Sequence, residues 1–305
     1  MSTAPSGDER LRGWDWQRAR LSAGELHFEN PDGLSHALGD GFFFVDQPSH
    51  QDLSAGDRFA RSFYLPAAGD PYRGYADRTA GQLGEHQGYY RREADQTEQF
   101  FLESRNWQAV YPPALVEQAL GMRALALDIL RAVLSHIDLP PSLWDEATGH
   151  SLAGQGTYTL TFNHFRPEVR ARGLNVHKDS GWVTVLRSLE PGLEVHRDGG
   201  WYPIDPVPGT FIVNFGCAME ILTRHTRTPV AAVAHRVTEQ PPVRPASGGD
   251  RFSYALFVDS SLDETACPGL FRYEPGVGLN LEMSFATFLS DILRNTYQED
   301  TSGLY

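Results

Sequence analysis

The chain changes character after Thr157, and this change restricts the folds open to it. Short stretches rich in β-branched and aromatic residues then follow one another, separated by Gly, Pro, Asp and Asn. Many short strands at such spacing are typical of a sandwich or a barrel, and the jelly roll is one way to close it. Asp198-Gly199-Gly200 predicts a hairpin between two of them. The predicted strands span residues 158–165, 182–186, 193–196, 210–214, 230–237 and 252–258.

The flanking sequence predicts further elements. Residues 41–45 are mostly aromatic and predict a buried strand, whereas residues 2–12 predict a mobile tail. From Pro113 apolar residues recur at helical spacing until Pro140-Pro141, which predicts an amphipathic helix of several turns. Residues 283–297 predict a terminal helix. Residues 65–110 are rich in Gly, Tyr and Arg without periodicity, and we expect a long loop region there.

These patterns predict a mainly β fold with flanking helices and a double-stranded β-helix (jelly roll) as its core. We expect one structural unit with three regions. Residues 1–150 form a mixed, partly helical region that packs on the core and contributes substrate loops. Residues 151–260 form the catalytic jelly roll. Residues 261–305 form a C-terminal helical segment and a possible lid.

Charge and apolar pattern narrow the choice of partner. The 305 residues carry a net charge of −13 and no cluster of Lys and Arg, so nucleic acid is not expected. No apolar run is long enough to span a bilayer, and the polar N-terminus lacks the pattern of a signal peptide. Cys217 and Cys267 are expected to be buried thiols in a reducing compartment. We expect a cytoplasmic monomer or weak homo-oligomer that acts on a small molecule.

The pattern His177-Lys178-Asp179, followed much later by His235, indicates a metal site. Residues i and i+2 of a strand share a face, so His177 and Asp179 point the same way. Two imidazoles and one carboxylate leave other metal positions open, which suits an Fe(II) that binds a co-substrate and O₂ together. His235 must then arrive from another strand, as barrel-like closure allows. The alternative is three ordinary polar residues at strand ends.

Arg251-Phe252-Ser253 repeats the i, i+2 geometry after the second histidine. A guanidinium and a hydroxyl on one strand face make a receptor for a carboxylate. Beside the metal ligands, that receptor can hold the far carboxylate of a dicarboxylic keto acid. The alternative is a surface salt bridge and an ordinary strand hydroxyl.

The segment 158–258 resembles the isopenicillin N synthase-like group of Fe(II)/2-oxoglutarate oxygenases, which includes cephalosporin ring-expanding enzymes and plant flavonoid oxygenases. The 55 residues between Asp179 and His235 match the spacing in that group. Residues 41–45 are similar to its G-F-F-x-V element. The matching segments are Asn163-His164-Phe165-Arg166-Pro167 (N-Y-Y-P-P), His177-Lys178-Asp179 (H-x-D), 182–186 (apolar strand), 192–195 (G-L-Q-V), 200–204 (G-x-W-x-x-V), 208–216 (P-G-x-x-x-V-N-x-G), 235–237, and Arg251-Phe252-Ser253 (R-x-S).

The resemblance implies the cofactors and their ligands. Fe(II) is held by His177, Asp179 and His235, with no catalytic residue beyond these ligands. The co-substrate 2-oxoglutarate is held by Arg251 and Ser253, in a pocket that includes Asn163, Leu186 and Val237. Phe165 replaces a tyrosine of the group, so one hydroxyl near the keto acid is lost. The gap between His235 and Arg251 is longer than usual, and we expect residues 241–250 to lengthen a hairpin turn.

The implied activity is that of a dioxygenase that uses O₂ and 2-oxoglutarate to oxidise a small specialised metabolite, amino-acid- or peptide-derived, as in antibiotic biosynthesis. Hydroxylation, desaturation, epoxidation and ring formation are possible outcomes, with succinate and CO₂ as co-products. An alternative is an isopenicillin N synthase-type Fe(II) oxidase that does not use 2-oxoglutarate. A non-catalytic β-helix binding module and a zinc hydrolase with the same three ligands are two further alternatives.

Substrate recognition is expected from segments at the mouth of the core, because the jelly roll itself offers few residues for selection. We expect the region 65–110 and the segment after residue 259 to be partly mobile without ligand and to order over the bound substrate as a lid. Each candidate has a second interpretation, as loop scaffold or as ordinary core packing. The candidate substrate-binding residues are Arg73, Tyr75, Arg105, Trp107, His164, Trp182 and Phe257.

Overall fold

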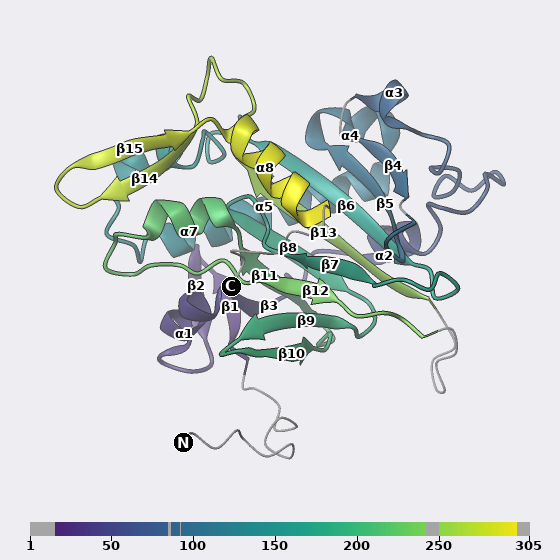
Figure 1. Cartoon of the computed structure of the whole chain (residues 1–305), viewed down its shortest axis with the longest axis horizontal. Coiled ribbons are helices and arrows are strands. Elements are labelled where there is room, and N and C mark those ends of the chain that lie inside the picture. The colour runs from purple at the N-terminus through teal and green to yellow at the C-terminus, as the bar shows by residue number, and fades with distance from the viewer. Residues whose placement is uncertain (1–15, 85–86, 92, 242–249, 298–305) are drawn as a thin grey trace.

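The computed structural model describes residues 16–84, 87–91, 93–241 and 250–297, with the side chains of 293–297 excepted. The tail expected over residues 2–12 lies outside these ranges, as does nearly all of the lengthened turn expected over 241–250. Figure 1 shows the central strands with helices around them, and the hairpin β14-β15 (residues 270–283) set apart from the two main sheets. The mainly β fold with flanking helices and a jelly-roll core is confirmed.

The larger sheet has nine strands in the order β2-β1-β3-β11-β8-β13-β6-β5-β4. All its neighbours pair antiparallel except β1 and β3. Its strands are β1 (Arg18–Ser22), β2 (Glu25–Phe28), β3 (Phe42–Asp46), β4 (Gly88–Arg91), β5 (Thr97–Glu103), β6 (Thr157–Phe165), β8 (Val183–Ser188), β11 (Thr210–Phe215) and β13 (Arg251–Asp259).

The smaller sheet has four strands in the order β10-β9-β12-β7. They are β7 (Leu174–His177), β9 (Leu193–Arg197), β10 (Gly200–Ile204) and β12 (His235–Val237). From β6 to β13 the chain passes repeatedly between the two sheets, which is how a jelly roll closes. Asp198 and Gly199 both have positive φ, 47° and 77°, so the predicted hairpin is a two-residue turn with a glycine where such a turn needs it.

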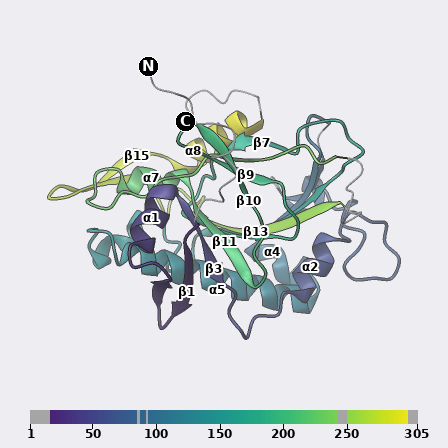
Figure 2. The ribbon, with the colours of Figure 1, turned by 90° about the horizontal axis from the view of Figure 1, so that it is seen from below.

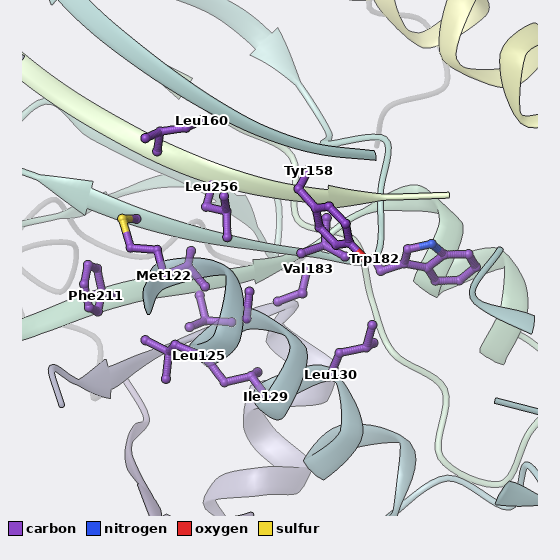
Figure 3. Close-up of a cluster of buried hydrophobic side chains, with 14 of the residues drawn as sticks. Met122, Leu125, Ile129, Leu130, Tyr158, Leu160, Trp182, Val183, Phe211 and Leu256 are labelled. Atoms are coloured by element: carbon purple, nitrogen blue, oxygen red, sulfur yellow. The ribbon is translucent and has the colours of Figure 1, made fainter. Parts of the chain in front are cut away.

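One helix covers the outer face of the larger sheet. The predicted amphipathic helix is α5 (Pro113–Leu134), and its apolar stripe includes Met122, Ile129 and Leu130, all fully buried. Figure 3 shows these side chains packed beneath the strands, close to Val183 and Leu256. Burial of each large apolar side chain stabilises the fold by about 1.5–3 kcal/mol. Figure 2 shows α5 on one side of the larger sheet and strands β7 and β9 on the other.

The other helices lie around this core. None of the helices in the described ranges, α5 included, has the length and apolarity needed to cross a bilayer. They are α1 (Gly33–Asp40), α2 (Ser54–Ala60), α3 (Ala80–Leu83), α4 (Ser104–Val110), a 3₁₀ turn (Pro141–Leu143), α6 (Trp144–Ala147), α7 (Cys217–Thr223) and α8 (Phe285–Tyr297).

The C-terminal region is an antiparallel hairpin, β14 (Leu270–Glu274) and β15 (Gly278–Met283), followed by the predicted terminal helix α8. The hairpin packs against α7, and α8 packs against β7 (Figure 1). The N-terminal half of α8 buries Phe285 and Phe288 against the main core. The side of α8 near the jelly roll therefore closes one end of the space between the sheets.

Two sequence expectations are corrected. Residues 65–110 are not one long loop, because β4, β5, α3 and α4 lie within them and β5 pairs along its whole length with β6. The sequence shows no strand alternation in β5 because both of its faces mix polar and apolar residues: Glu98 shares one face with Phe100, and Phe101 lies on the cavity face with polar neighbours. The strand expected over 230–237 is limited to β12, since residues before His235 make no ladder. Cys217 and Cys267 are both buried and free, as expected.

Candidate metal centre and co-substrate cavity

His177, Asp179 and His235 come together in the space between the two sheets. β7 and β12 pair antiparallel with His177 opposite His235, and the two ring centroids are 4.3 Å apart. Asp179 follows β7 in a turn and is 6% exposed. One ligand atom from each residue lies within 4.8 Å of the others, the one such group of three in the described part of the chain.

The two imidazoles are held so that the same nitrogen of each faces the carboxylate. His177 Nδ1 lies 2.9 Å from the carbonyl oxygen of Asn175, and His235 Nδ1 lies 3.1 Å from that of Val233. Backbone acceptors at Nδ1 place the proton there and leave Nε2 with its lone pair. The Nε2 atoms of His177 and His235 lie 3.8 Å and 3.7 Å from Asp179 Oδ1.

The larger sheet fixes the carboxylate of Asp179. Thr184 Oγ1 on β8 donates to Asp179 Oδ2 at 2.6 Å, and Asn214 Nδ2 on β11 donates to the same oxygen at 2.5 Å. Oδ2 is thus committed to the protein, while Oδ1 is left for the two imidazoles. Such hydrogen bonds to a ligand orient it and tune its affinity for a metal.

The electrostatics keep the three groups in the forms that bind metal. Burial, together with the neighbouring His235, lowers the pKa of His177 to about 4, so the imidazole is neutral at pH 7. Burial alone would raise the pKa of Asp179, but His235 and His177 and the hydrogen bonds from Thr184 and Asn214 lower it overall. A metal ligand must be a neutral imidazole or an ionised carboxylate.

This donor set fits one divalent ion. Two donors bound at about 2.0–2.2 Å to the same ion are roughly 3–3.8 Å apart, depending on the angle between them. The separations between Asp179 Oδ1 and the imidazole nitrogens lie in that range. Two imidazoles and one carboxylate on one face, with space on the other side, form the arrangement found in non-haem Fe(II) oxygenases.

A cavity of about 970 Å³ opens from the three residues. One wall is the inner face of the larger sheet, where alternate residues of β6 and β13 point inward. On β13 these are Arg251, Ser253, Ala255, Phe257 and Asp259, all of which line the cavity. The predicted metal ligands and the predicted carboxylate receptor therefore share one space.

Arg251 is buried at one end of this cavity with 1% of its surface exposed. Its Nε donates to the carbonyl oxygen of Pro191 at 3.1 Å, and its Nη2 donates to Ser188 Oγ at 3.1 Å. Its Nη1 lies 3.4 Å from Ser253 Oγ, and the guanidinium stacks over Phe165 at 4.4 Å from the ring centroid. These contacts hold a planar fork in a fixed orientation, as recognition of a carboxylate requires.

The protein comparisons agree with this geometry. Residues 157–260 match the model of the 2OG-Fe(II) oxygenase superfamily. This segment belongs to that superfamily. The match covers the strands from β6 to β13, and so it includes all three candidate metal ligands and the Arg251–Ser253 pair.

The chain is also similar to several curated plant proteins. DMR6-like oxygenase 2 of Arabidopsis thaliana is 29% identical over 157 residues, which is 50% of this chain and 41% of that protein. Thebaine 6-O-demethylase of Papaver somniferum is 32% identical over 118 residues, or 37% of this chain and 30% of that protein. The chain spans between 30% and 41% of the length of the curated relatives it matches.

Solved oxygenase structures share the fold over most of the chain. A Neurospora crassa protein in complex with 2-oxoglutarate and thymine has a TM-score of 0.62 at 16% identity, covering 87% of this chain and 92% of its own. The dioxygenase for auxin oxidation in rice has a TM-score of 0.59 at 22% identity, covering 86% and 87%. The fold likeness thus extends beyond the oxygenase segment into the flanking regions.

The remaining residues predicted for 2-oxoglutarate lie at the Arg251 end. Asn163, Leu186 and Val237 all line the cavity. Asn163 Oδ1 accepts a hydrogen bond from Gln99 Nε2 at 2.6 Å, and its Nδ2 lies 3.4 Å from Ser253 Oγ. The structure therefore gathers the predicted co-substrate residues in one place.

The candidate substrate residues divide into two groups. Arg105 and Phe257 line the cavity, as expected of them. Tyr75 and Trp107 do not, because both are core residues, 2% and 1% exposed. Trp107 Nε1 donates to the carbonyl oxygen of Leu102, and the Tyr75 hydroxyl donates to backbone carbonyls.

Three more candidates are also displaced from the cavity wall. His164 follows the inward Asn163 and so points through the opposite face of β6, where it hydrogen-bonds to Glu98 and Asp250 and stacks on Tyr64. Trp182 precedes β8 and is fully buried, with its Nε1 donating to Ser260 Oγ at 3.2 Å. Arg73 lies on the 65–74 turn and is not among the cavity residues.

Asp259 is a cavity residue that the sequence patterns did not single out. It lies four inward positions after Arg251 on the same strand, so the i, i+2 alternation that linked Arg251 with Ser253 already pointed to it. Thr157 and Thr159 on β6 also line this part of the cavity. The C-terminal region contributes Leu262 from its first turn and Leu289 and Ile292 from α8.

Proposed function

We propose that the chain is an Fe(II)- and 2-oxoglutarate-dependent dioxygenase of the isopenicillin N synthase-like group, which oxidises a small, amino-acid- or peptide-derived specialised metabolite. One observation carries the proposal. A complete set of two imidazoles and one carboxylate shares a cavity with a buried, fixed guanidinium that lies on the face of the same sheet. The segment that holds both belongs to the 2OG-Fe(II) oxygenase superfamily.

In this proposal His177, Asp179 and His235 hold Fe(II). When bound, Fe(II) and 2-oxoglutarate supply the oxidation of the substrate by O₂, with succinate and CO₂ as co-products. Thr184 and Asn214 keep Asp179 oriented through its Oδ2, so that Oδ1 and the two Nε2 atoms present one face. Because a carboxylate fills the third protein position, we expect oxygenation or desaturation chemistry rather than halogenation.

Arg251 and Ser253 bind the distal carboxylate of 2-oxoglutarate and set its orientation. The guanidinium is already fixed by Ser188 and Pro191, so little side-chain entropy is lost when the keto acid binds. Phe165, Leu186 and Val237 surround this end with apolar surface, which excludes water from the keto acid.

The helix α8 and the turn that begins at Leu262 close the opposite side of the cavity. Leu289 and Ile292 point into the cavity from α8, and Leu262 is 41% exposed. We propose that this segment is the lid that admits substrate and then shields the site from solvent. Among the substrate-binding residues predicted from the sequence, Arg105 and Phe257 are the two that contact the substrate in this proposal.

Succinate release tests the proposal. The protein is loaded anaerobically with Fe(II) and 2-oxoglutarate, exposed to O₂, and screened with small molecules for substrate-stimulated succinate. Asp179→Ala is the inactive control, and Asp198→Asn, on the hairpin turn, is the matched carboxylate change outside the site. O₂ uptake without succinate would favour the Fe(II) oxidase, and activity without O₂ would favour a zinc hydrolase.

A further inference from the structure

The inward row of β13 ends at a buried carboxylate for which the proposed reaction has no role. We propose that Asp259 forms a subsite for a cationic amine, so that the substrate of this oxygenase is a compact molecule with a basic nitrogen. This inference rests on the proposed function and names the chemical class of its substrate.

Asp259 lies on the opposite side of the metal ligands from Arg251. On β13, Phe257 pairs with Thr184, whose hydroxyl donates to Asp179. Asp259 is the next inward residue after Phe257 in the direction away from Arg251, a step of roughly 6–7 Å along the strand. The keto acid occupies the Arg251 side, so the Asp259 side is the space left for the substrate.

The carboxyl group of Asp259 is buried without a positive partner. It is 8% exposed, and Ser180 Oγ donates to its Oδ1 at 2.9 Å. Its Oδ2 receives no hydrogen bond from the described residues, and no Lys, Arg or His among them lies within ion-pair distance. Since Asp259 lines the cavity, a bound molecule is placed to supply the missing donor.

Apart from Arg251, which the keto acid engages, the two other Lys and Arg side chains that line the cavity are already paired with carboxylates. Arg105 Nε lies 2.8 Å from Glu103 Oε2, and Lys178 Nζ lies 3.2 Å from Glu220 Oε2. Neither is therefore placed to neutralise Asp259. The substrate side consequently has an excess of negative charge, which favours a cation and disfavours a carboxylate.

Neutral groups around Asp259 complete the subsite. Thr157 pairs with Asp259 across β6 and β13, and Thr159 is the next inward residue of β6. Their hydroxyls make no hydrogen bond to the described residues and can accept the remaining protons of an ammonium group. Phe257, Leu289 and Ile292 supply apolar surface for the rest of the molecule.

The state of the carboxyl group is consistent with this role. Burial, together with the nearby Asp179, raises the pKa of Asp259 to about 7, although the hydrogen bond from Ser180 acts to lower it. An ionised carboxylate at this depth lacks solvation until a cation binds beside it. A neutral or anionic ligand does not replace the solvation that the ionised carboxylate has lost.

The test compares ligands that share a scaffold and differ in their terminal group, which is cationic, neutral or anionic. Matched amine, alcohol and carboxylate trios on phenyl, indolyl and cyclohexyl scaffolds, such as 3-phenylpropylamine, 3-phenylpropan-1-ol and 3-phenylpropanoate, are titrated calorimetrically into the Fe(II)- and 2-oxoglutarate-loaded protein without O₂. Asp259→Asn keeps an oxygen for the Ser180 hydrogen bond, and Asp198→Asn is the matched change at an exposed aspartate of the turn between β9 and β10, outside the site. Asp259→Ser replaces the first variant if that one does not fold.

We expect the wild type and Asp198→Asn to bind amines roughly 10- to 100-fold more tightly than the matched alcohols, the effect of a charge-assisted hydrogen bond. Asp259→Asn should lose that preference while its affinity for 2-oxoglutarate is unchanged. A preference for alcohols or carboxylates, an amine preference that survives in Asp259→Asn, or no binding of any amine would overturn the inference. Succinate release with the same compounds is measured separately, so loss of the proposed function is distinguishable from loss of the subsite.

Discussion

Replacing Arg251 by lysine tests the co-substrate assignment most directly. Lysine keeps the positive charge but has no planar fork, so it cannot make two parallel hydrogen bonds to the distal carboxylate of 2-oxoglutarate. In the structure the fork is fixed by Ser188, Pro191 and Phe165, and a lysine ammonium cannot maintain all three contacts. The keto acid therefore loses at least one charge-assisted hydrogen bond.

The magnitude follows from that loss. A hydrogen bond to a charged group contributes about 1.5–3 kcal/mol, which corresponds to a rise of roughly 10- to 150-fold in the 2-oxoglutarate concentration required. Iron affinity should remain near that of the wild type, because the metal ligands belong to β7, β12 and the turn after β7, in the other sheet. Succinate release at increasing 2-oxoglutarate measures the first quantity, and anaerobic Fe(II) titration measures the second.

The matched control is Arg187→Lys. Arg187 lies on β8 next to the same part of β13, but it points through the opposite face and pairs with Asp57. The variant Arg187→Lys should therefore change the 2-oxoglutarate concentration required for turnover only slightly. An unchanged requirement in Arg251→Lys would refute the assignment and would favour an oxidase in which Arg251 contacts the main substrate.

Three further predictions concern the metal, the loop residues and pH. Asp179→Ala should abolish turnover and weaken Fe(II) binding, since it removes a ligand and the acceptor of two hydrogen bonds, and normal turnover with normally bound iron would exclude the triad. Arg105 lines the cavity, so Arg105→Ala should weaken substrate binding and leave the substrate-independent consumption of 2-oxoglutarate intact. Trp107 is buried in the core, so Trp107→Ala should instead lower the free energy of unfolding, measured by urea denaturation, by about 3–5 kcal/mol. Burial alone would raise the pKa of Glu98, but the hydrogen bond from His164 lowers the pKa overall. The ionised Glu98 therefore stabilises the folded protein above pH 4.5, and this stabilisation is lost as the pH falls below that value. Urea denaturation at pH 7 and pH 4 should show a smaller difference for Glu98→Gln than for the wild type, and an equal difference would contradict this origin.

The sequence alone determined the features that depend on residues close together in the chain. The spacing of Arg251 and Ser253 follows from the two-residue repeat of a strand, and both line the cavity. His177 is the last residue of β7 and Asp179 lies just beyond it, so their closeness follows from their short separation in the chain, and both also line the cavity. The apolar repeat after Pro113 defined α5 because helical spacing is also a local property. These patterns, with the resemblance they carry, predicted the jelly roll and the gathering of the candidate metal ligands.

Tertiary structure decided which face of each element meets the cavity. Tyr75 and Trp107 have the composition of a binding loop, but long-range pairing of β5 with β6 places them in the core beneath the sheet. His164 is next to an inward residue, and a shift of one position sends its side chain to the other face.

Asp259 shows the same division most clearly. Its inward direction follows from strand alternation, which the sequence contains. Its burial, its lack of a positive partner among the described residues and its place beyond the metal ligands depend on β6, β8, the turn after Asp179 and α8. These segments are distant in the chain, and the charge balance of a cavity is a sum over all of them. For that physical reason only the folded structure determines what the cavity is suited to bind.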